Sequence, residues 1–304
     1  MGKIDIHLHL GTESRRYERA RPAGKEVTYL SGTTPHEPMM KMSSSIDMLP
    51  HLQELGISRG ILLSGGESSE MGNNEEICQA ASMVPGVYHW MGNLDPIHPE
   101  TVEERLRQLK QKGAVGVGEF AANFWIGTEF IEAVFAAAER LELPILCHMS
   151  PEAGFNYGIA DHPGLPLLES ALERYPNLVF IGHSQPFWHE ISGDASPNKE
   201  ERNSWGKGKV ILGGRLITLF EKFPNLYGDL SANSGGNAIM RDEEFGLTFL
   251  ERFQDRLMFG SDMANNEMVF PLGGWLDQML KEKRLSRQVY EKICWKNAQQ
   301  VFGI

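Results

Sequence analysis

The chain begins with the stretch Lys3-Ile4-Asp5-Ile6-His7-Leu8-His9-Leu10-Gly11, in which apolar and polar residues alternate. In a β-strand, successive side chains point to opposite faces. We therefore expect Asp5, His7 and His9 to share one face, and the isoleucines and leucines to share the other. This pattern predicts a strand with an apolar back and a polar face that directs two imidazoles to one point.

The length of 304 residues, with 41% hydrophobic and 23% charged residues, is typical of a globular enzyme with a large core. The formal net charge of -11 argues against a protein that binds nucleic-acid phosphates or anionic membranes. The three cysteines (Cys78, Cys147 and Cys294) are far apart and lack CxxC spacing. A disulfide framework or a structural zinc site is therefore not expected. The cysteine pattern instead favours a reducing compartment.

No basic and apolar leader precedes the first predicted strand, and no apolar run approaches the roughly 18–20 residues that span a bilayer. We expect a cytoplasmic protein that acts on a small-molecule substrate, with no nucleic-acid or membrane partner. A homo-oligomer is compatible with the sequence.

After the first strand, short apolar segments alternate with amphipathic helical patterns, as in a chain of β-strand and α-helix units. The segments predicted as strands are 60–64, 87–91, 115–119, 144–148, 178–183, 226–230 and 257–262. The segments predicted as helices are 129–141, a segment that Thr101 caps, 165–175, 216–223, 243–253 and 286–301.

Eight strands that alternate with helices predict an α/β protein with a (β/α)₈ TIM barrel. An open, doubly wound sheet is the structural alternative. No repeat, low-complexity tract or linker divides the chain, so we expect residues 1–304 to form one domain.

Polar side chains end five of the predicted strands. Active sites of TIM barrels lie where the C-terminal ends of the strands meet, so we expect these side chains to converge. Imidazole nitrogens and carboxylate oxygens are suitable ligands for zinc, manganese or iron. The candidate residues for a metal site are His7, His9, Glu119, His148, His183 and Asp262.

Each candidate also has an ordinary structural interpretation. A single histidine after a strand is commonly a hydrogen-bonded core residue, Asp262 could cap a following helix, and Glu119 could be a solvated loop carboxylate. The shared position at the ends of successive strands favours the metal site over these separate interpretations.

The motif His7-Leu8-His9, followed in order by His148, His183 and Asp262, resembles the amidohydrolase superfamily of metal-dependent barrels. The phrases Leu226-Tyr-Gly-Asp-Leu-Ser231 and Asp255-Arg-Leu-Met-Phe-Gly-Ser-Asp262 are similar to its amidohydrolase-related branch. That branch contains hydrolases, lactonases and non-oxidative decarboxylases of the aminocarboxymuconate-semialdehyde and resorcylate types. The resemblance extends from the first strand to the last.

The resemblance implies that His7, His9, His148 and Asp262 hold one metal, with His183 beside the reacting water or the substrate oxygen. Many binuclear relatives bridge two metals with a carboxylated lysine on the fourth strand. This chain has Glu119 there, which is more similar to the glutamate of TatD-type hydrolases. If Glu119 bridges, His183 would bind a second metal; if it does not, the site is mononuclear.

We therefore expect one or two divalent transition-metal ions per chain, with Zn²⁺ as the first choice and Mn²⁺ or Fe²⁺ as alternatives. Such an ion lowers the pKa of a bound water to roughly 7. The resemblance implies that Asp262 takes the proton of this water and passes it to the leaving group. His183 would orient the water or stabilise the developing oxyanion. In a decarboxylase, the same two residues would manage protonation at carbon.

Two predicted connections are long enough to cover the rim of the barrel. The first carries Arg15, Arg16, Arg19 and Arg21, and guanidinium groups bind carboxylates well. The second follows the sixth strand and carries Phe187, Trp188 and His189. We take Arg15, Arg16, Trp188 and His189 as candidate substrate-binding residues, although a solvated surface is the common role of an arginine-rich loop. Asp229 and Ser231 face the same rim, and we expect them to hydrogen-bond the metal ligands.

The sequence thus predicts a metal-dependent hydrolase that acts on an amide, ester or lactone of a small carboxylated molecule. A non-oxidative decarboxylase is the alternative, because both enzymes use the same ligand set. The third hypothesis is a barrel that binds metal without catalysis. The complete set of ligand and proton-transfer residues argues against it.

Overall fold

The computed structural model describes residues 2–18, 39–70, 72–155 and 157–304. All of the predicted strands are present, and parallel pairing joins them into two sheets. The first sheet has the order β1-β4-β5, and the second has the order β11-β10-β9-β7-β6. The strands in these two orders are β1 (Lys3–Leu8), β4 (Ile57–Leu63), β5 (Tyr88–Met91), β6 (Val117–Phe120), β7 (Ile145–Ser150), β9 (Phe180–His183), β10 (Leu226–Asp229) and β11 (Leu257–Met258). The short strand β8 (Ile159–Ala160) pairs with β7.

The two sheets meet at both edges and form a barrel. At one seam, Leu8 forms a parallel bridge with Met263, beyond β11, and the amide of Ile6 donates to the carbonyl of Phe259 over 3.1 Å. At the other seam, Gly92 bridges to Val117, and the amide of Gly118 donates to the carbonyl of Gly92 over 2.9 Å. An open, doubly wound sheet is therefore wrong, because such a sheet leaves two unpaired edges.

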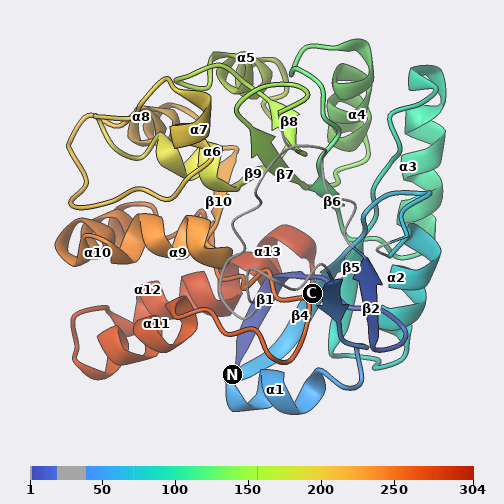
Figure 1. The fold of residues 1–304 in the computed structure, drawn as a ribbon, viewed down its shortest axis with the longest axis horizontal. Coiled ribbons are helices and arrows are strands. Elements are labelled where there is room, and N and C mark those ends of the chain that lie inside the picture. The colour runs from blue at the N-terminus through green and yellow to red at the C-terminus, as the bar shows by residue number, and fades with distance from the viewer. Residues whose placement is uncertain (1, 19–38, 71, 156) are drawn as a thin grey trace.

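The helices lie around the outside of the strands (Figure 1). They are α1 (Leu49–Glu54), α2 (Asn74–Ser82), α3 (Val102–Gln111), α4 (Glu129–Arg140), α5 (Pro166–Arg174), α6 (Gln185–His189), α7 (Lys199–Arg202), α8 (Arg215–Lys222), α9 (Ala232–Met240), α10 (Glu243–Arg252), α11 (Leu272–Lys281), α12 (Arg287–Glu291) and α13 (Asn297–Phe302), with short turns η1 (Pro99–Thr101) and η2 (Lys292–Lys296). Their apolar faces and the outer faces of the strands form one large core.

The predicted alternation of side chains along β1 is wrong in its first half. Ile4 and Ile6 belong to a small apolar cluster inside the ring of strands, whereas Leu8 and Leu10 pack into the outer core. The inner cluster also contains Leu146 and Ile181, which precede His148 and His183 by two residues and so share their face. The physical reason is a shift in the pairing of β1 with β4 between Asp5 and Leu8, because a bulge reverses the faces that follow it.

Part of the long connection after β1 forms regular structure, which the sequence did not indicate. β2 (Arg15–Glu18) pairs antiparallel with β3 (Met39–Met42). The backbone of Gly11 then bridges to Ser44, which ties the ribbon to the end of β1. Residues 19–38, with Arg19 and Arg21, lie outside the described part of the chain.

Two predicted helices differ in detail. Thr101 does not cap α3, because its hydroxyl donates to the carbonyl of His98 over 2.8 Å instead. The predicted helix 286–301 consists of α12, the π-helical turn η2 and α13 in succession. The predicted helices over 129–141, 165–175, 216–223 and 243–253 are confirmed to within a residue or two.

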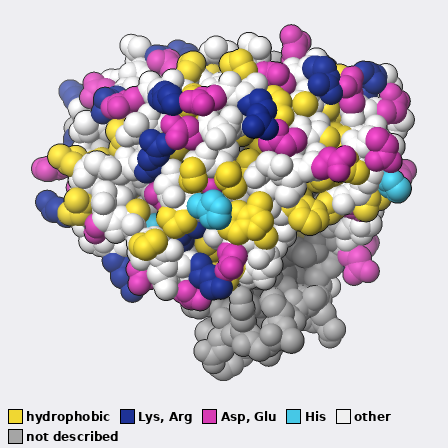
Figure 2. Space-filling model, turned by 90° about the horizontal axis from the view of Figure 1, so that it is seen from above, with side chains coloured by type: hydrophobic (Ala, Val, Ile, Leu, Met, Phe, Trp, Pro, Cys, Tyr) yellow, Lys and Arg dark blue, Asp and Glu magenta, His cyan; other side chains and the backbone are white. Residues whose placement is uncertain are grey.

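The described part of the surface has mixed charge. Figure 2 shows acidic and basic side chains interspersed on the face seen from above, so the described part of this face has no continuous basic area. Each helix within the described residues is too short or too polar to cross a membrane.

Close packing behind His183 gives a test of the fold. A Cβ at Gly182 would lie 2.2–2.6 Å from ring atoms of Phe187. We therefore expect Gly182→Ala to lower the free energy of unfolding by about 1–3 kcal/mol, because a filled core cannot accept another methyl group. Gly274→Ala is the matched control, since nothing lies within 4 Å of that Cβ and the residue is in α11. Denaturant unfolding of both variants checks this, and equal stabilities would contradict the packing argument.

Candidate metal centre

The barrel brings three candidate ligand atoms from β1 and the segment after β11 to one point. The Nε2 atoms of His7 and His9 lie 3.1 Å apart. Oδ1 of Asp262 lies 3.3 Å from Nε2 of His7 and 3.2 Å from Nε2 of His9. Side chains separated by more than 250 positions in the sequence thus form a compact triangle.

This triangle has the dimensions of a metal site. Ligand atoms about 2.1 Å from a common ion lie roughly 3.0–3.4 Å from one another in octahedral or tetrahedral coordination. The three observed separations fall within that range. The donor set of two imidazoles and a carboxylate is also suitable for a divalent transition metal. The residues present therefore fit such an ion.

Glu119 lies between two pairs of histidines. Its Oε2 lies 3.9 Å from Nε2 of His7 and 3.6 Å from Nε2 of His9. Its Oε1 lies 2.5 Å from Nδ1 of His148 and 3.7 Å from Nε2 of His183. Each carboxylate oxygen thus faces a different pair, which is the arrangement that a bridging carboxylate needs. A second group of possible ligands consists of His7, Glu119 and His183.

Asp229, at the end of β10, fixes two of the imidazoles. Its buried Oδ2 lies 2.7 Å from Nδ1 of His7 and 3.0 Å from Nδ1 of His183. The hydroxyl of Ser231 donates to the same oxygen over 2.7 Å. An ionised carboxylate can only accept, so Nδ1 of His7 donates its proton to Asp229, and Nε2 is the nitrogen that faces the other candidate ligands. The expected hydrogen-bonding contacts of Asp229 and Ser231 with the candidate ligands His7 and His183 are therefore present.

The electrostatics of the site keep its carboxylates ionised. Burial alone would raise the pKa of Glu119 and of Asp262, but the neighbouring histidines outweigh burial and hold both pKa values below the usual range. Burial also lowers the pKa of His7, yet Asp262, Asp229 and Glu119 together raise it to about 10. The cluster of carboxylates thus strongly favours a positive charge at this position, which a bound cation would supply.

His148 differs from the expected arrangement. Its Nδ1 contacts Glu119 rather than the triangle of His7, His9 and Asp262, and its Nε2 is buried without a hydrogen-bond partner among the described residues. The ring of Tyr157 packs on the imidazole with a centroid distance of 4.0 Å. The backbone of Gly158 closes the same side, where a Cβ would lie 2.8 Å from the imidazole ring. His148 is therefore held at the Glu119 end of the site.

Asp262 does not cap a helix. The next helix, α11, begins ten residues later at Leu272. The backbone of Asp262 has a φ of 63°, and its amide donates to the carbonyl of His7 over 2.8 Å. This left-handed backbone is uncommon for a residue other than glycine. Its carboxylate is 28% exposed, the largest exposure in the triangle.

The sequence analysis missed Asn93. Its side-chain amide donates to the carbonyl of Glu119 over 2.6 Å and to the carbonyl of Ser64 over 3.2 Å. Asn93 thus ties the end of β6 to the end of β4 and holds the backbone that presents Glu119. The residue lies two positions after β5, so the rule that polar residues at strand ends serve the site would have found it.

The candidate substrate-binding arginines lie on the β2–β3 ribbon. Arg15 donates to both carboxylate oxygens of Glu76 in α2, over 2.5 and 2.6 Å. Thr12 contacts the same carboxylate through its amide, over 3.3 Å. An internal carboxylate thus already engages the guanidinium of Arg15, whereas Arg16 is exposed. A role of either arginine in substrate binding stays a prediction.

The aromatic residues of α6 are packed inside the protein. Phe187 is fully buried, and Trp188 is nearly so. The indole of Trp188 donates to the carbonyl of Asp229 over 3.0 Å, so it supports the strand that carries this residue. His189 is half-buried and accepts a hydrogen bond from the amide of Ser196 over 2.9 Å. The substrate-binding roles of Trp188 and His189 stay predictions.

Comparison with known proteins identifies a family that matches nearly the whole chain. A family model described as "Amidohydrolase" matches residues 4–304. No curated protein matches the chain.

Solved structures share the fold at low sequence identity. An apo structure from Agrobacterium tumefaciens has a TM-score of 0.59 and 16% identity, over 100% of this chain and 96% of its own. A Pseudomonas putida protein named as a 2-pyrone-4,6-dicarboxylic acid hydrolase has a TM-score of 0.56 and 16% identity, over 99% and 97%. The 5-carboxyvanillate decarboxylase of Sphingomonas paucimobilis has a TM-score of 0.54 and 16% identity, over 84% and 82%. These likenesses show the TIM-barrel fold.

The hydrogen bonds of Asp229 give a test of the site. We expect Asp229→Asn to weaken the binding of Zn²⁺ by about 10–100-fold, because the amide removes the charge that orients His7 and His183. Competition with a chromophoric chelator measures the affinity. Asp255→Asn is the control, since Asp255 is exposed and pairs only with Lys292 among the described residues. Unchanged affinity in Asp229→Asn would show that these hydrogen bonds do not support a metal site.

Proposed function

Because the chain belongs to the amidohydrolase family, we propose that it is a metal-dependent hydrolase that cleaves an amide, ester or lactone bond in a small carboxylated molecule. The observation that supports this most directly is the position of Asp262. Its carboxylate contacts both imidazoles of the His7–His9 pair and is also the most open group of the triangle. A carboxylate in this position can reach both a metal and a reacting water.

We propose that His7, His9 and Asp262 hold one divalent cation, and that Glu119, His148 and His183 complete a second site. When bound, such a cation supplies a Lewis acid and a water of lowered pKa. Glu119 supports the two-site proposal because its two oxygens face the two histidine pairs separately. Zn²⁺ is the proposed metal, given the nitrogen-rich donor set.

Asp262 and His183 would then have separate roles, the first in proton transfer and the second in orienting water or stabilising charge. Asp262 is ionised at neutral pH, since the histidines hold its pKa low, so it can accept a proton from water at its exposed face. It can return that proton to the leaving group. Nε2 of His183 lies 3.9 Å from Oδ2 of Asp262 and faces the same space, so this imidazole can orient the water or stabilise negative charge on the substrate oxygen.

A decarboxylase remains the second candidate, because the same residues would serve it. The relatives named above include both a hydrolase and a decarboxylase. The likeness to the named hydrolase covers 99% of the chain, whereas that to the named decarboxylase covers 84%. Both likenesses concern the fold, so assays are needed to separate the two reactions.

Metal stoichiometry tests the two-site proposal. We expect elemental analysis of the gently purified protein to find about two transition-metal ions per chain. Glu119→Gln should retain about one, because it removes the charged bridge but leaves His7, His9 and Asp262 in place. Glu54→Gln, an exposed change in α1, should match the unmodified chain. Protein that binds no metal even after incubation with Zn²⁺ would contradict the proposal.

The role of Asp262 is testable by substitution. We expect Asp262→Asn to lower turnover by about 10²–10⁴-fold, because asparagine cannot accept the proton. Circular dichroism should show an unchanged fold, since asparagine has the same shape. Turnover close to that of the unmodified enzyme, at saturating Zn²⁺, would remove Asp262 from the mechanism.

Two parallel assays separate the hydrolase from the decarboxylase. The first measures acid release from lactones, esters and amides that carry a carboxylate, including 2-pyrone-4,6-dicarboxylic acid. The second measures carbon dioxide release from aromatic and unsaturated carboxylic acids, including 5-carboxyvanillate. We expect turnover in the first panel, whereas turnover confined to the second would establish the decarboxylase instead.

A further inference from the structure

The loop that follows β7 covers His148, and its described part, residues 151–155 and 157–161, is called the β7 loop below. The ring of Tyr157 packs on the imidazole with a centroid distance of 4.0 Å, and the backbone of Gly158 closes the same side. His148 is 3% exposed, whereas Tyr157 is 46% exposed. On this side, the β7 loop therefore stands between a candidate metal ligand and solvent, and whatever holds the loop also holds His148.

One guanidinium joins the two ends of the β7 loop. Nη1 of Arg202, in α7, donates to the carbonyl of Pro151 over 3.1 Å and to the carbonyl of Asp161 over 3.0 Å. Nη2 donates to the carbonyl of His162 over 3.1 Å. Pro151 is the first residue of the loop and Asp161 is the last, so these hydrogen bonds close the loop.

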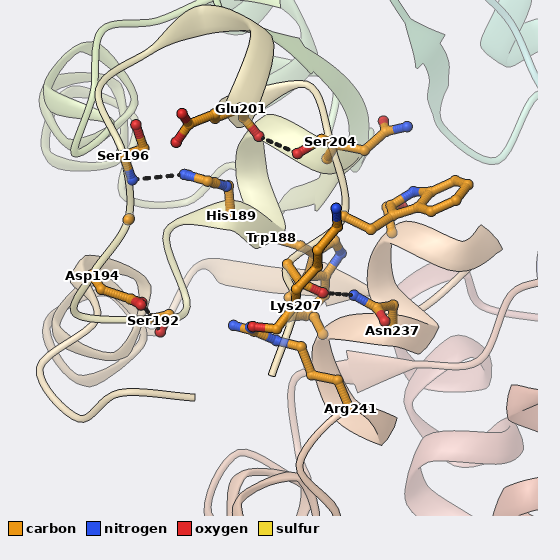
Figure 3. Close-up of a pocket in the computed structure, with 16 residues that line it drawn as sticks. Trp188, His189, Ser192, Asp194, Ser196, Glu201, Ser204, Lys207, Asn237 and Arg241 are labelled. Atoms are coloured by element: carbon orange, nitrogen blue, oxygen red, sulfur yellow. Dashed lines mark hydrogen bonds between the residues drawn. The ribbon is translucent and has the colours of Figure 1, made fainter. Parts of the chain in front are cut away.

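The side chain of Arg202 is directed into the protein. Figure 3 shows a cavity of about 120 Å³ beside α7, with Glu201 and Ser204 in its wall. Arg202 does not line this cavity and is only 1% exposed. Its guanidinium therefore faces the β7 loop rather than the cavity or the solvent.

The burial of Arg202 is costly in free energy. Its Nε is buried without a hydrogen-bond partner among the described residues and lies 3.8 Å from Oε1 of Glu190. That oxygen already accepts a hydrogen bond from the amide of Gly164 over 2.9 Å. A buried charge that lacks a close, bidentate carboxylate adds little net stability. The hydrogen bonds to the carbonyls at the ends of the loop are therefore the principal interactions of this guanidinium.

The middle of the β7 loop is tied to the segment after β6. The amide of Gly158 donates to the carbonyl of Ala121 over 3.1 Å, and the side-chain amide of Asn123 donates to the carbonyl of Gly158 over 3.0 Å. Glu119 lies two residues before Ala121. The loop thus connects the backbone beside Glu119 with the cover of His148, whose Nδ1 lies 2.5 Å from Oε1 of Glu119.

We propose that Arg202 is a positioning residue for His148. By closing the β7 loop, it keeps Tyr157 and Gly158 on the imidazole and so keeps His148 against Glu119. Arg202 acts through the loop and not through contact with a metal or a substrate. The role rests on the proposed function only in that His148 is assigned there to the second metal site.

Chemical modification of the metal-free protein tests this role. Diethyl pyrocarbonate reacts with accessible neutral imidazoles, and mass spectrometry measures the rate at each histidine. In the unsubstituted chain we expect His148 to react slowly and the exposed His98 to react rapidly. Arg202→Lys should raise the rate at His148 by at least about tenfold, because an ammonium group lacks the planar fork that holds both ends of the loop.

His183 distinguishes positioning from a general loosening of the protein. It belongs to the same centre and is 2% exposed, but Asp229 holds its Nδ1. We expect its rate to stay unchanged in Arg202→Lys. An unchanged rate at His148, or an equal increase at His148 and His183, would overturn the proposal.

Two further variants are measured in the same way. Arg174→Lys is the matched control, since Arg174 pairs with Glu132 on the surface, and it should leave His148 protected. Tyr157→Ala removes the cover directly and should expose His148 without loss of the fold, because Tyr157 lies at the surface. Continued protection of His148 in Tyr157→Ala would contradict the proposal.

Hydrogen exchange in the unsubstituted chain gives a test that does not depend on the folding of a variant. The amides of Gly158, Ala160 and Asp161 are hydrogen-bonded in the closed loop. Each should exchange at least about 100-fold more slowly than a freely exposed amide. Exchange near the rate of an exposed amide would show that the loop is not held in place and would overturn the proposal.

Zn²⁺ binding connects this role with the proposed function. Arg202→Lys should bind the first Zn²⁺ with unchanged affinity and the second about 10–100-fold more weakly, because His148 is no longer held in place. Two Zn²⁺ ions bound with unchanged affinities in this variant would contradict the proposal. If the unsubstituted chain binds only one Zn²⁺, the two-site proposal fails, whereas the modification rates still decide the role of Arg202.

Discussion

The structure of the site depends on one buried carboxylate. Asp229 lies at the end of β10 and contacts Nδ1 of both His7 and His183. These contacts hold two imidazoles from different strands at a fixed angle, with their Nε2 atoms directed to the mouth of the barrel. Trp188 in turn donates to the carbonyl of Asp229, so the packing of α6 supports the same residue. The packing of α6 thus supports the metal centre through Asp229.

The closed barrel is what places these groups within reach of one another. His7 and Asp262 come from opposite ends of the chain, and the seam between β1 and the segment after β11 joins them. The amide of Asp262 donates to the carbonyl of His7, so the hydrogen bond that closes the barrel also positions two candidate ligands. Closure and site formation are therefore one event, and loss of the seam would separate the ligands.

The polar residues at strand ends were the most informative feature of the sequence. Where predictions from the sequence failed, the failure has a physical reason. The rule located Glu119, His148 and His183 because parallel strands of a barrel end on one face. It would have located Asn93 as well. The alternation expected along β1 failed for the faces of Ile4 and Ile6, because a shift in pairing between β1 and β4 breaks the period of two.

The sequence by itself determined the fold class, the order of the strands and the residue types that meet at the rim. These properties depend on local periodicity and on the chemistry of single side chains, which neighbouring residues reveal. Only the tertiary structure decided that Glu119 faces two histidine pairs and that Glu76 engages Arg15. Such arrangements depend on distances between segments remote in the chain, and those distances exist only after the barrel has closed.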